Sequence, residues 1–166
     1  FLLLAVSVPM LIIALLVKFT SPGPVFFRQK RYGLDGREIM VWKFRSMTVC
    51  ESGDNFTQAT RNDRRTTRVG AILRKTSLDE LPQLFNVFVG QMSLVGPRPS
   101  PDQENQYCPA WRRARLSTKP GITGLWQVLR NREECTSDFQ EWIYYDVEYA
   151  RHRCFWLDLQ IIFYTP

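Results

Sequence analysis

Histidine is almost missing from this chain: His152 is the only one among 166 residues, and arginines flank it on both sides. A Ser–His catalytic triad or a zinc site built on histidines is therefore not expected. The cysteines show neither CxxC pairs nor metal-type spacing, and we interpret them as free thiols of a reducing compartment. They are Cys50, Cys108, Cys135 and Cys154. No internal repeat or low-complexity segment divides the chain, and its length predicts a single domain.

Acidic residues are also in short supply, with 16 Asp and Glu against 22 Lys and Arg, a formal net charge of +6. This balance favours an anionic partner, which is nucleic acid, a lipid headgroup or a phosphorylated metabolite. Several segments combine an apolar stripe with Trp or Tyr and flanking cations, a pattern typical of helices that lie on a bilayer surface.

The longest apolar run covers residues 1–17, interrupted by Ser7 and Pro9. A straight helix of this length spans about 25 Å, slightly less than the hydrocarbon core of a bilayer. Three interpretations stay open: the end of a spanning helix, a signal sequence without an evident cleavage site, or a helix bent at Pro9 that enters and leaves by the same face. In the last case Ser7 can satisfy a backbone group that Pro9 frees. The run starts without a methionine, so the chain looks like a fragment, and the cations after it predict a cytoplasmic polar part.

Beyond this run the pattern indicates an α+β fold that is mostly helical. Residues 25–27 and 39–42 are predicted as short strands joined by a hairpin loop. Residues 51–67 are polar and predicted as a loop, and tight turns are predicted at 96–99 and 119–124. The predicted helices cover residues 69–74, 102–115, 139–153 and 156–163.

Residues 76–86 place two adjacent carboxylates, Asp79 and Glu80, at the start of a predicted helix. Ser77 and Glu80 have the spacing of a capping box, or else Asp79 is itself the cap, which keeps Pro82 in the first turn. In either arrangement the helix dipole should keep Asp79 ionised and favour a phosphate beside it. The polar residues that fall away from the apolar stripe of this helix are Asp79, Gln83 and Asn86.

Five motifs occur in order: residues 21–29 (SPGPVFFRQ), 43–47 (KFRSM), 76–86 (TSLDELPQLFN), 92–99 (MSLVGPRP) and 119–128 (KPGITGLWQV). Together they closely resemble the bacterial sugar transferase family, the monotopic polyprenol-phosphate phosphoglycosyl transferases, over nearly the whole chain. The resemblance implies a re-entrant membrane helix at residues 1–19 and a catalytic domain at residues 20–166. It also implies a β-hairpin and interfacial amphipathic helices around an active site on the cytoplasmic face of the bacterial inner membrane.

The resemblance also implies a reaction. Family members move a sugar-1-phosphate from a UDP-sugar to undecaprenyl phosphate and release UMP, with magnesium and a covalent enzyme intermediate, as the first membrane step of exopolysaccharide, O-antigen or glycoconjugate assembly. The family's Asp-Glu dyad falls on Asp79 and Glu80. Asp79 would attack the β-phosphorus, which is nucleophilic catalysis that divides one transfer into two steps. Both carboxylates would also supply the oxygens that Mg²⁺ prefers beside phosphate.

Further positions follow from the same resemblance as substrate-binding residues. Lys43 and Arg45 lie in the KFRSM block, and Arg74 is a basic residue just before the dyad. Three more are Arg98 in the Pro-Arg-Pro turn, Asp158 in the closing Trp-x-Asp block and an arginine after Trp-Gln-Val. For the last, Arg130 and Arg132 are both candidates, and we favour Arg132. For each of these positions a structural ion pair is the competing interpretation.

Two other functions remain open at this point. A membrane-anchored module that binds anionic lipid or nucleic acid without chemistry would use the same arginines. An inactive homologue is a further alternative, against which the intact dyad argues. The transferase interpretation predicts a UDP-sugar, undecaprenyl phosphate and a lipid bilayer as partners and no nucleic acid, and it leaves room for a homodimer. The sequence does not specify the sugar.

Overall fold

The computed structural model describes residues 2–48, 63–100, 109–129 and 139–165. Its contacts divide the chain into two compact units. The first consists of residues 1–29 and 40–86, and the second of residues 30–39 and 87–166. The units interleave along the sequence because the tip of a β-hairpin belongs to the second one.

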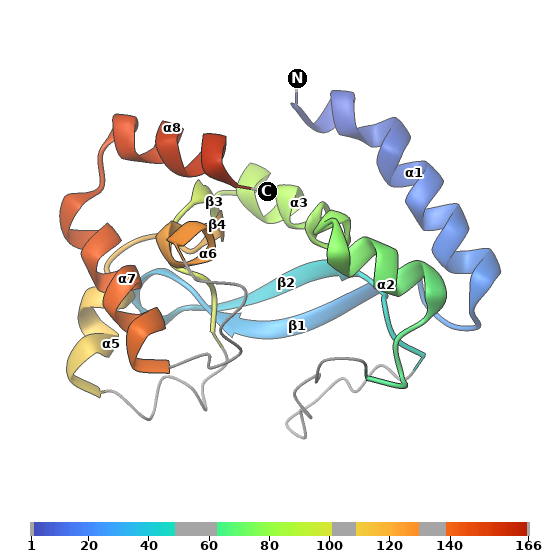
Figure 1. The fold of residues 1–166 in the computed structure, drawn as a ribbon, viewed down its shortest axis with the longest axis horizontal. Helices are drawn as coiled ribbons and strands as arrows, with labels where there is room; N and C mark the ends of the chain where they lie inside the picture. The colour runs from blue at the N-terminus through green and yellow to red at the C-terminus, as the bar shows by residue number, and fades with distance from the viewer. Residues whose placement is uncertain (1, 49–62, 101–108, 130–138, 166) are drawn as a thin grey trace. The chain divides into compact units, whose positions relative to one another are not determined.

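The first unit contains helices α1 (Leu2–Thr20) and α2 (Arg68–Lys75), the 3₁₀ turn η2 (Leu78–Glu80) and the start of helix α3 (Gln83–Phe88). Strands β1 (Phe26–Tyr32) and β2 (Glu38–Phe44) form a two-stranded sheet that the units share (Figure 1). The predicted hairpin is therefore confirmed, with longer strands than expected. The buried core of this unit consists of Met10, Ile13, Val17, Phe44 and Leu73.

Helix α1 has one buried and one exposed face. Met10, Ile13 and Val17 recur at helical spacing and pack into the core. Large apolar side chains are exposed on the rest of the helix, namely Val8, Leu11, Ile12, Leu15, Leu16 and Phe19. The helix continues through Pro9 as one element (Figure 1). The re-entrant bend at Ser7 and Pro9 stays a prediction. Within the described ranges, no helix combines the length and the hydropathy that crossing a membrane requires.

Helix α2 confirms the helix predicted over residues 69–74, and it begins at a side-chain cap. The Thr67 hydroxyl accepts a hydrogen bond from the backbone N–H of Gly70 at 2.9 Å. Gly70 packs directly on the chain that follows β2, because a Cβ there would come within 2.0 Å of the Ser46 carbonyl oxygen. The backbone N–H of Thr67 donates to the same oxygen at 3.0 Å. These contacts fix the start of α2 against the end of the hairpin.

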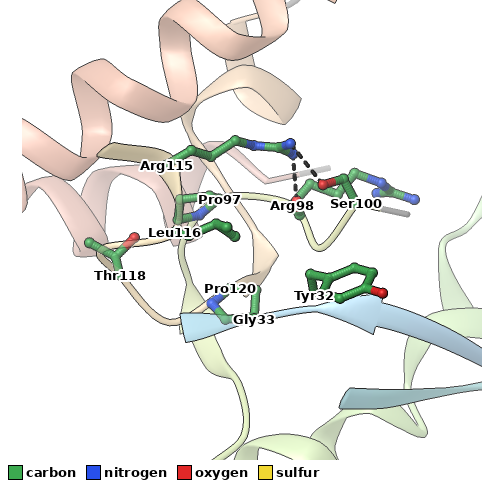
Figure 2. A pocket seen from close by; sticks show the side chains of 9 residues that line it. All are labelled: Tyr32, Gly33, Pro97, Arg98, Ser100, Arg115, Leu116, Thr118 and Pro120. Atoms are coloured by element: carbon green, nitrogen blue, oxygen red, sulfur yellow. Dashed lines mark hydrogen bonds between the residues drawn. The ribbon is translucent and has the colours of Figure 1, made fainter. Parts of the chain in front are cut away.

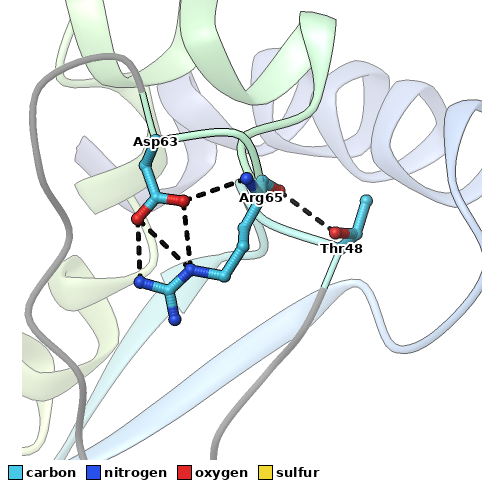
Figure 3. Close-up of polar contacts among 3 residues, drawn as sticks. All are labelled: Thr48, Asp63 and Arg65. Atoms are coloured by element: carbon cyan, nitrogen blue, oxygen red, sulfur yellow. Dashed lines mark hydrogen bonds and ion pairs between the residues drawn. The ribbon is translucent and has the colours of Figure 1, made fainter.

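A second group of contacts joins Thr48 to Arg65, one on each side of residues 49–62 (Figure 3). The backbone N–H and the hydroxyl of Thr48 donate to the Arg65 carbonyl at 2.8 and 3.2 Å. The Arg65 guanidinium in turn forms a two-pronged ion pair with Asp63, at 2.8 Å between Nη2 and Oδ2. The ends of the predicted loop are therefore held together, while its residues 51–62 lie outside the described residues.

In the residues that the structure describes, the second unit holds four further α-helices and a short second sheet. Its remaining elements are η1 (Leu34–Gly36), β3 (Ser93–Val95), α5 (Pro109–Arg115), β4 (Gly121–Thr123), α6 (Leu125–Leu129), α7 (Phe139–His152) and α8 (Phe155–Tyr164). Helices α7 and α8 confirm the two predicted C-terminal helices. Helix α5 confirms the end of the helix predicted over 102–115, whose residues 102–108 lie outside the described part. Cys154 is an exposed free thiol, as predicted, and the other three cysteines lie outside the described residues.

Strands β3 and β4 pair in parallel, with Ser93 opposite Gly121 and Val95 opposite Thr123 (Figure 1). The tight turn predicted at 119–124 is therefore wrong for residues 121–123. The glycine there serves a close approach of two backbones, because a Cβ on Gly121 would come within 2.1 Å of the Gly96 backbone nitrogen. Val95 anchors a buried cluster beside this pair.

Candidate active site

The Asp79–Glu80 dyad lies in the separate 3₁₀ turn η2 rather than in the first turn of a helix. Ser77 adopts the left-handed conformation, with φ of 56°, and its side chain makes no capping hydrogen bond. Helix α3 begins only at Gln83, so neither Ser77 nor Asp79 caps it. The predicted capping box is therefore wrong. Pro82, which cannot donate a backbone hydrogen bond, lies between η2 and α3, although Leu81 before it keeps helical geometry, with φ of −51° and ψ of −37°.

The polar residues of this segment face inward. Asp79, Gln83 and Asn86 are only 8%, 3% and 2% exposed. Asn86 explains why: its amide donates to the Met40 carbonyl at 2.8 Å, and its Oδ1 accepts from the Trp42 backbone N–H at 3.4 Å. This side chain therefore ties α3 to β2 with both ends of its amide. The predicted apolar stripe does not form a single buried face, because Leu78, Phe85 and Phe88 are exposed.

Strand β2 brings a cation to the dyad. The Lys43 ammonium lies 2.6 Å from Glu80 Oε1, and the two side chains are 20% and 14% exposed. The distance and the partial burial make this a charge-assisted hydrogen bond of the stronger kind. Two carboxylates that adjoin in sequence thus acquire a fixed positive neighbour from a strand 37 residues upstream.

Burial, more than charge, determines the acidity of Asp79. Loss of solvent raises the pKa of its carboxyl above the usual 3.8, and the neighbouring Glu80 carboxylate raises it further. Lys43 is the main opposing influence on this pKa, followed by Arg74. The helix start that was expected to keep Asp79 ionised is absent, and the two cations offset only part of the effect of burial on this pKa. Arg74 itself is exposed at the end of α2.

Arg45, predicted to bind substrate, lies at the end of α1. Its buried guanidinium donates to the carbonyl oxygens of Ser21 and Pro22, both at 2.6 Å. Asp158 accepts a hydrogen bond from the Tyr149 hydroxyl at 2.8 Å and so joins α8 to α7. Arg130 and Arg132 lie outside the described residues.

In the second unit, Arg98 is held through its backbone. The Arg115 guanidinium donates to the Arg98 carbonyl and to the Ser100 hydroxyl, both at 2.8 Å, as Figure 2 shows. Arg115 also pairs with Asp146 at 2.7 Å, and both side chains are almost fully buried. Asp146 accepts a backbone hydrogen bond from Arg98 as well. The Pro-Arg-Pro turn is thus fixed from two sides by one buried ion pair.

The same turn borders a small cavity that also lies against Tyr32, Thr118 and Pro120 (Figure 2). Its volume is about 10 Å³, close to the minimum that one water molecule requires. The Thr118 hydroxyl is buried without a hydrogen-bond partner in the described structure. The cavity is therefore suited to a single water and is too small for a nucleotide.

Comparison with known sequences decides the family. The profile of the family described as bacterial sugar transferase matches residues 1–166. The chain belongs to the bacterial sugar transferase family.

Relatives in this family carry specific names. The chain is 52% identical over 168 residues to a UDP-glucose:undecaprenyl-phosphate glucose-1-phosphate transferase of Klebsiella pneumoniae, with 98% of this chain and 36% of the relative covered. It is 48% identical to the protein of the same name in Escherichia coli K12, with the same coverage. A UDP-N-acetylgalactosamine-undecaprenyl-phosphate N-acetylgalactosaminephosphotransferase of Aeromonas hydrophila is 40% identical, with 94% of this chain and 38% of the relative covered. The chain thus spans little more than a third of the length of these family members.

Within this bacterial sugar transferase chain, sequence patterns missed three structurally important side chains. Arg115 ends the helix predicted over 102–115, where it has the same appearance in sequence as Arg112 and Arg113, although of these three only Arg115 is buried. Asp146 and Asn86 are single polar residues in amphipathic helices and gave no signal of their own. The available clue was spacing, because Asp146 and Trp142 lie four residues apart on α7. Both contact Arg115: Asp146 pairs with its guanidinium, and the ring centroid of Trp142 lies 4.4 Å from Arg115 Cζ.

Proposed function

We propose that this bacterial sugar transferase moves a sugar-1-phosphate from a UDP-sugar to undecaprenyl phosphate and releases UMP. The observation that carries the proposal is the cluster of Asp79, Glu80 and Lys43, in which a buried carboxylate lies beside a second carboxylate and a lysine fixed at 2.6 Å from it. The names of the relatives supply the substrate classes.

In the first step a carboxylate oxygen of Asp79 attacks the β-phosphorus of the UDP-sugar. The bond from that phosphorus to the oxygen bridging the two phosphates breaks, and UMP leaves with this oxygen. In the second step a phosphate oxygen of undecaprenyl phosphate attacks the same phosphorus, which frees the carboxylate and yields a lipid-linked sugar diphosphate. Phosphoryl transfer depends mainly on positioning and on compensating charge, and Lys43 and Arg74 provide positive charge near the nucleophile.

Magnesium fits this site. Asp79 and Glu80 offer carboxylate oxygens of the kind that bind Mg²⁺ together with substrate phosphates. The ion would neutralise phosphate charge when bound. Asp79 and Glu80 are the residues that would hold the ion, beside the Lys43 ammonium at 2.6 Å from Glu80 Oε1. The test of this assignment is that Asp79→Asn and Glu80→Gln weaken Mg²⁺ binding measured by calorimetry.

The location we propose is the cytoplasmic face of the bacterial inner membrane, with α1 inserted as a re-entrant helix. The support is the contiguous exposed apolar surface of α1, because large apolar patches on a protein surface mark interaction with a membrane or a partner. Lys18 is exposed at the end of this helix, where a cation favours the anionic cytoplasmic leaflet.

The deciding experiment measures UMP release from a panel of UDP-sugars, including UDP-glucose and UDP-N-acetylgalactosamine, with undecaprenyl phosphate and magnesium in detergent. We expect release from one sugar, its loss in Asp79→Asn, and a phosphosugar adduct on the peptide that holds residue 79 when the lipid is omitted. UMP release that persists in Asp79→Asn would refute the covalent role. No release from any sugar, with binding to anionic lipid retained, would favour the binding module.

A further inference from the structure

The end of α1 and the end of β2 are joined by one buried side chain. Arg45, which follows β2 directly, is 2% exposed. Its Nη2 donates to the Ser21 carbonyl at 2.6 Å, to the Ser21 hydroxyl at 2.7 Å and to the Val17 carbonyl at 3.3 Å. Its Nη1 donates to the Pro22 carbonyl at 2.6 Å.

This arrangement pairs the end of α1 and the two residues after it with both terminal nitrogens of the guanidinium. The last turn of a helix has carbonyl groups without intrahelical partners and carries the negative end of the helix dipole. A guanidinium has five N–H groups in a planar fork and can reach several such oxygens at once. In the part of the chain described, every hydrogen bond of the Arg45 guanidinium goes to the end of α1 or to the two residues after it. Both terminal nitrogens are therefore engaged by the protein itself, and the Nε that has no hydrogen-bond partner in the described structure is buried rather than open to a substrate.

Gly23 makes room for the guanidinium. A Cβ at this position would lie 2.0 Å from Arg45 Nη1, so any larger residue would displace the arginine head group. Gly23 also has a φ of +122°, which side chains other than glycine rarely adopt. The turn after α1 is therefore shaped around Arg45.

Strand β2 carries the effect to the dyad. Lys43 is the second-last residue of β2 and precedes Arg45 by two positions. Phe44, between them, is 1% exposed and packs in the core with Met10, Ile13 and Val17 of α1. The Arg45 backbone N–H also donates to the Val25 carbonyl at 2.9 Å. The segment that places the Lys43 ammonium beside Glu80 is thus fixed to α1 by its core packing and by Arg45.

We propose that Arg45 is a positioning residue: by locking the end of α1 onto β2, it sets the position of the Lys43 ammonium at Glu80. It does so without contacting substrate, in contrast to the role that the family resemblance suggested. The consequence for turnover rests on the proposed function, whereas the consequence for the Lys43–Glu80 contact does not.

The first test measures the reactivity of Lys43 by competitive acetylation and mass spectrometry in the intact chain. We expect Arg45→Met to raise this reactivity about tenfold, because a displaced Lys43 loses its charge-assisted bond to Glu80. Arg45→Lys should give an intermediate value, since an ammonium reaches fewer of the four oxygens. Arg28→Met is the matched control: Arg28 is an exposed arginine of the same hairpin, stacked on Trp42 at 4.0 Å, and its loss should leave Lys43 unchanged.

Gly23→Ala provides a second route that retains the arginine. It should raise Lys43 reactivity in the wild-type background, and it should add little in the Arg45→Met background, where no head group remains to be displaced. This double-mutant comparison keeps the test decisive if Arg45→Met folds poorly. Unchanged Lys43 reactivity in folded Arg45→Lys and Gly23→Ala would overturn the proposal.

The second test separates positioning from substrate contact. In the UMP-release assay Arg45→Lys should lower kcat while KM for the UDP-sugar stays within about twofold. A raised KM with unchanged Lys43 reactivity would show that Arg45 binds substrate and would overturn the proposal. If wild-type protein releases no UMP, the proposed function fails, and the acetylation results still decide whether Arg45 positions Lys43.

Discussion

Replacing Arg115 by methionine should destabilise the second unit strongly. The change removes hydrogen bonds to Asp146 at 2.7 Å and to the Arg98 carbonyl and the Ser100 hydroxyl at 2.8 Å, while methionine retains much of the buried volume. Removal of one partner of a buried ion pair typically costs about 3–5 kcal/mol, because the other charge remains buried. We expect a loss of about 4 kcal/mol at pH 7.5, a large part of the stability of a typical domain.

The size of this loss should depend on pH. Burial raises the pKa of Asp146 to about 6, against the lowering effect of Arg115. Without Arg115 the pKa of Asp146 rises further. An acid whose folded pKa is raised contributes stability at low pH that disappears as the pH rises through that pKa. In the wild type the stability contributed by Asp146 stops falling just above pH 6, and in the variant it continues to fall at higher pH. The difference in unfolding free energy should therefore grow above pH 6, by at most about 1.4 kcal/mol per pH unit.

Urea unfolding followed by tryptophan fluorescence measures both effects, and Trp142 reports locally because it stacks on Arg115. Arg113→Met is the control, since Arg113 is an exposed arginine of the same helix and its loss should cost less than about 0.5 kcal/mol. A loss below about 1 kcal/mol for Arg115→Met at pH 7.5 would refute the reasoning about the buried pair. A loss of the expected size that is independent of pH between 5 and 8 would refute the assignment of its pH dependence to Asp146.

Three further changes test other parts of the structure. Lys43→Met removes the main influence that lowers the pKa of Asp79, so the acid limb of the pH–rate profile should move to higher pH, while Lys75→Met, an exposed neighbour of Arg74, should leave it in place. Asn86→Leu leaves the Met40 carbonyl and the Trp42 N–H without their partner. It should lower the unfolding free energy by about 2–3 kcal/mol in urea titrations, whereas an effect under about 0.5 kcal/mol would show that water replaces the amide. Thr67→Ala removes the cap of α2 and should cost about 1 kcal/mol, with Thr67→Ser, which keeps the hydroxyl, close to wild type in the same titration.

The hairpin and the helices α2, α7 and α8 were predictable because their signals are local. Apolar periodicity and turn residues act within a few positions of the chain, and the five family motifs fixed the dyad in sequence. The parallel pairing of β3 with β4 was not predictable in this way, because it joins residues 28 positions apart, such as Ser93 and Gly121. Gly121 has the same appearance as a turn glycine unless the partner strand is known.

The local environment of the dyad was predicted incorrectly for a related reason. A carboxylate pair followed by an apolar run resembles a capped helix, and the pattern contains no information about which face another element covers. Asn86 reverses the expected orientation, because an amide that bonds to both Met40 and Trp42 requires α3 to turn its polar side toward β2. Once that side is buried, Asp79 is buried as well, and its acidity is governed by loss of solvent.

The burial of Asp79 also explains why a cation is held beside the dyad. A carboxylate in a solvent-poor site is a poor nucleophile while it remains protonated, so a raised pKa opposes the proposed attack on phosphorus. Lys43, held at 2.6 Å from Glu80, lowers the pKa of Asp79 from a contact with the neighbouring carboxylate. This influence requires that Lys43 be held in place. Glu80 provides the contact, and Arg45, directly after the same strand, provides the position. A small displacement of α1 should therefore change the acidity of Asp79 through Arg45 and Lys43.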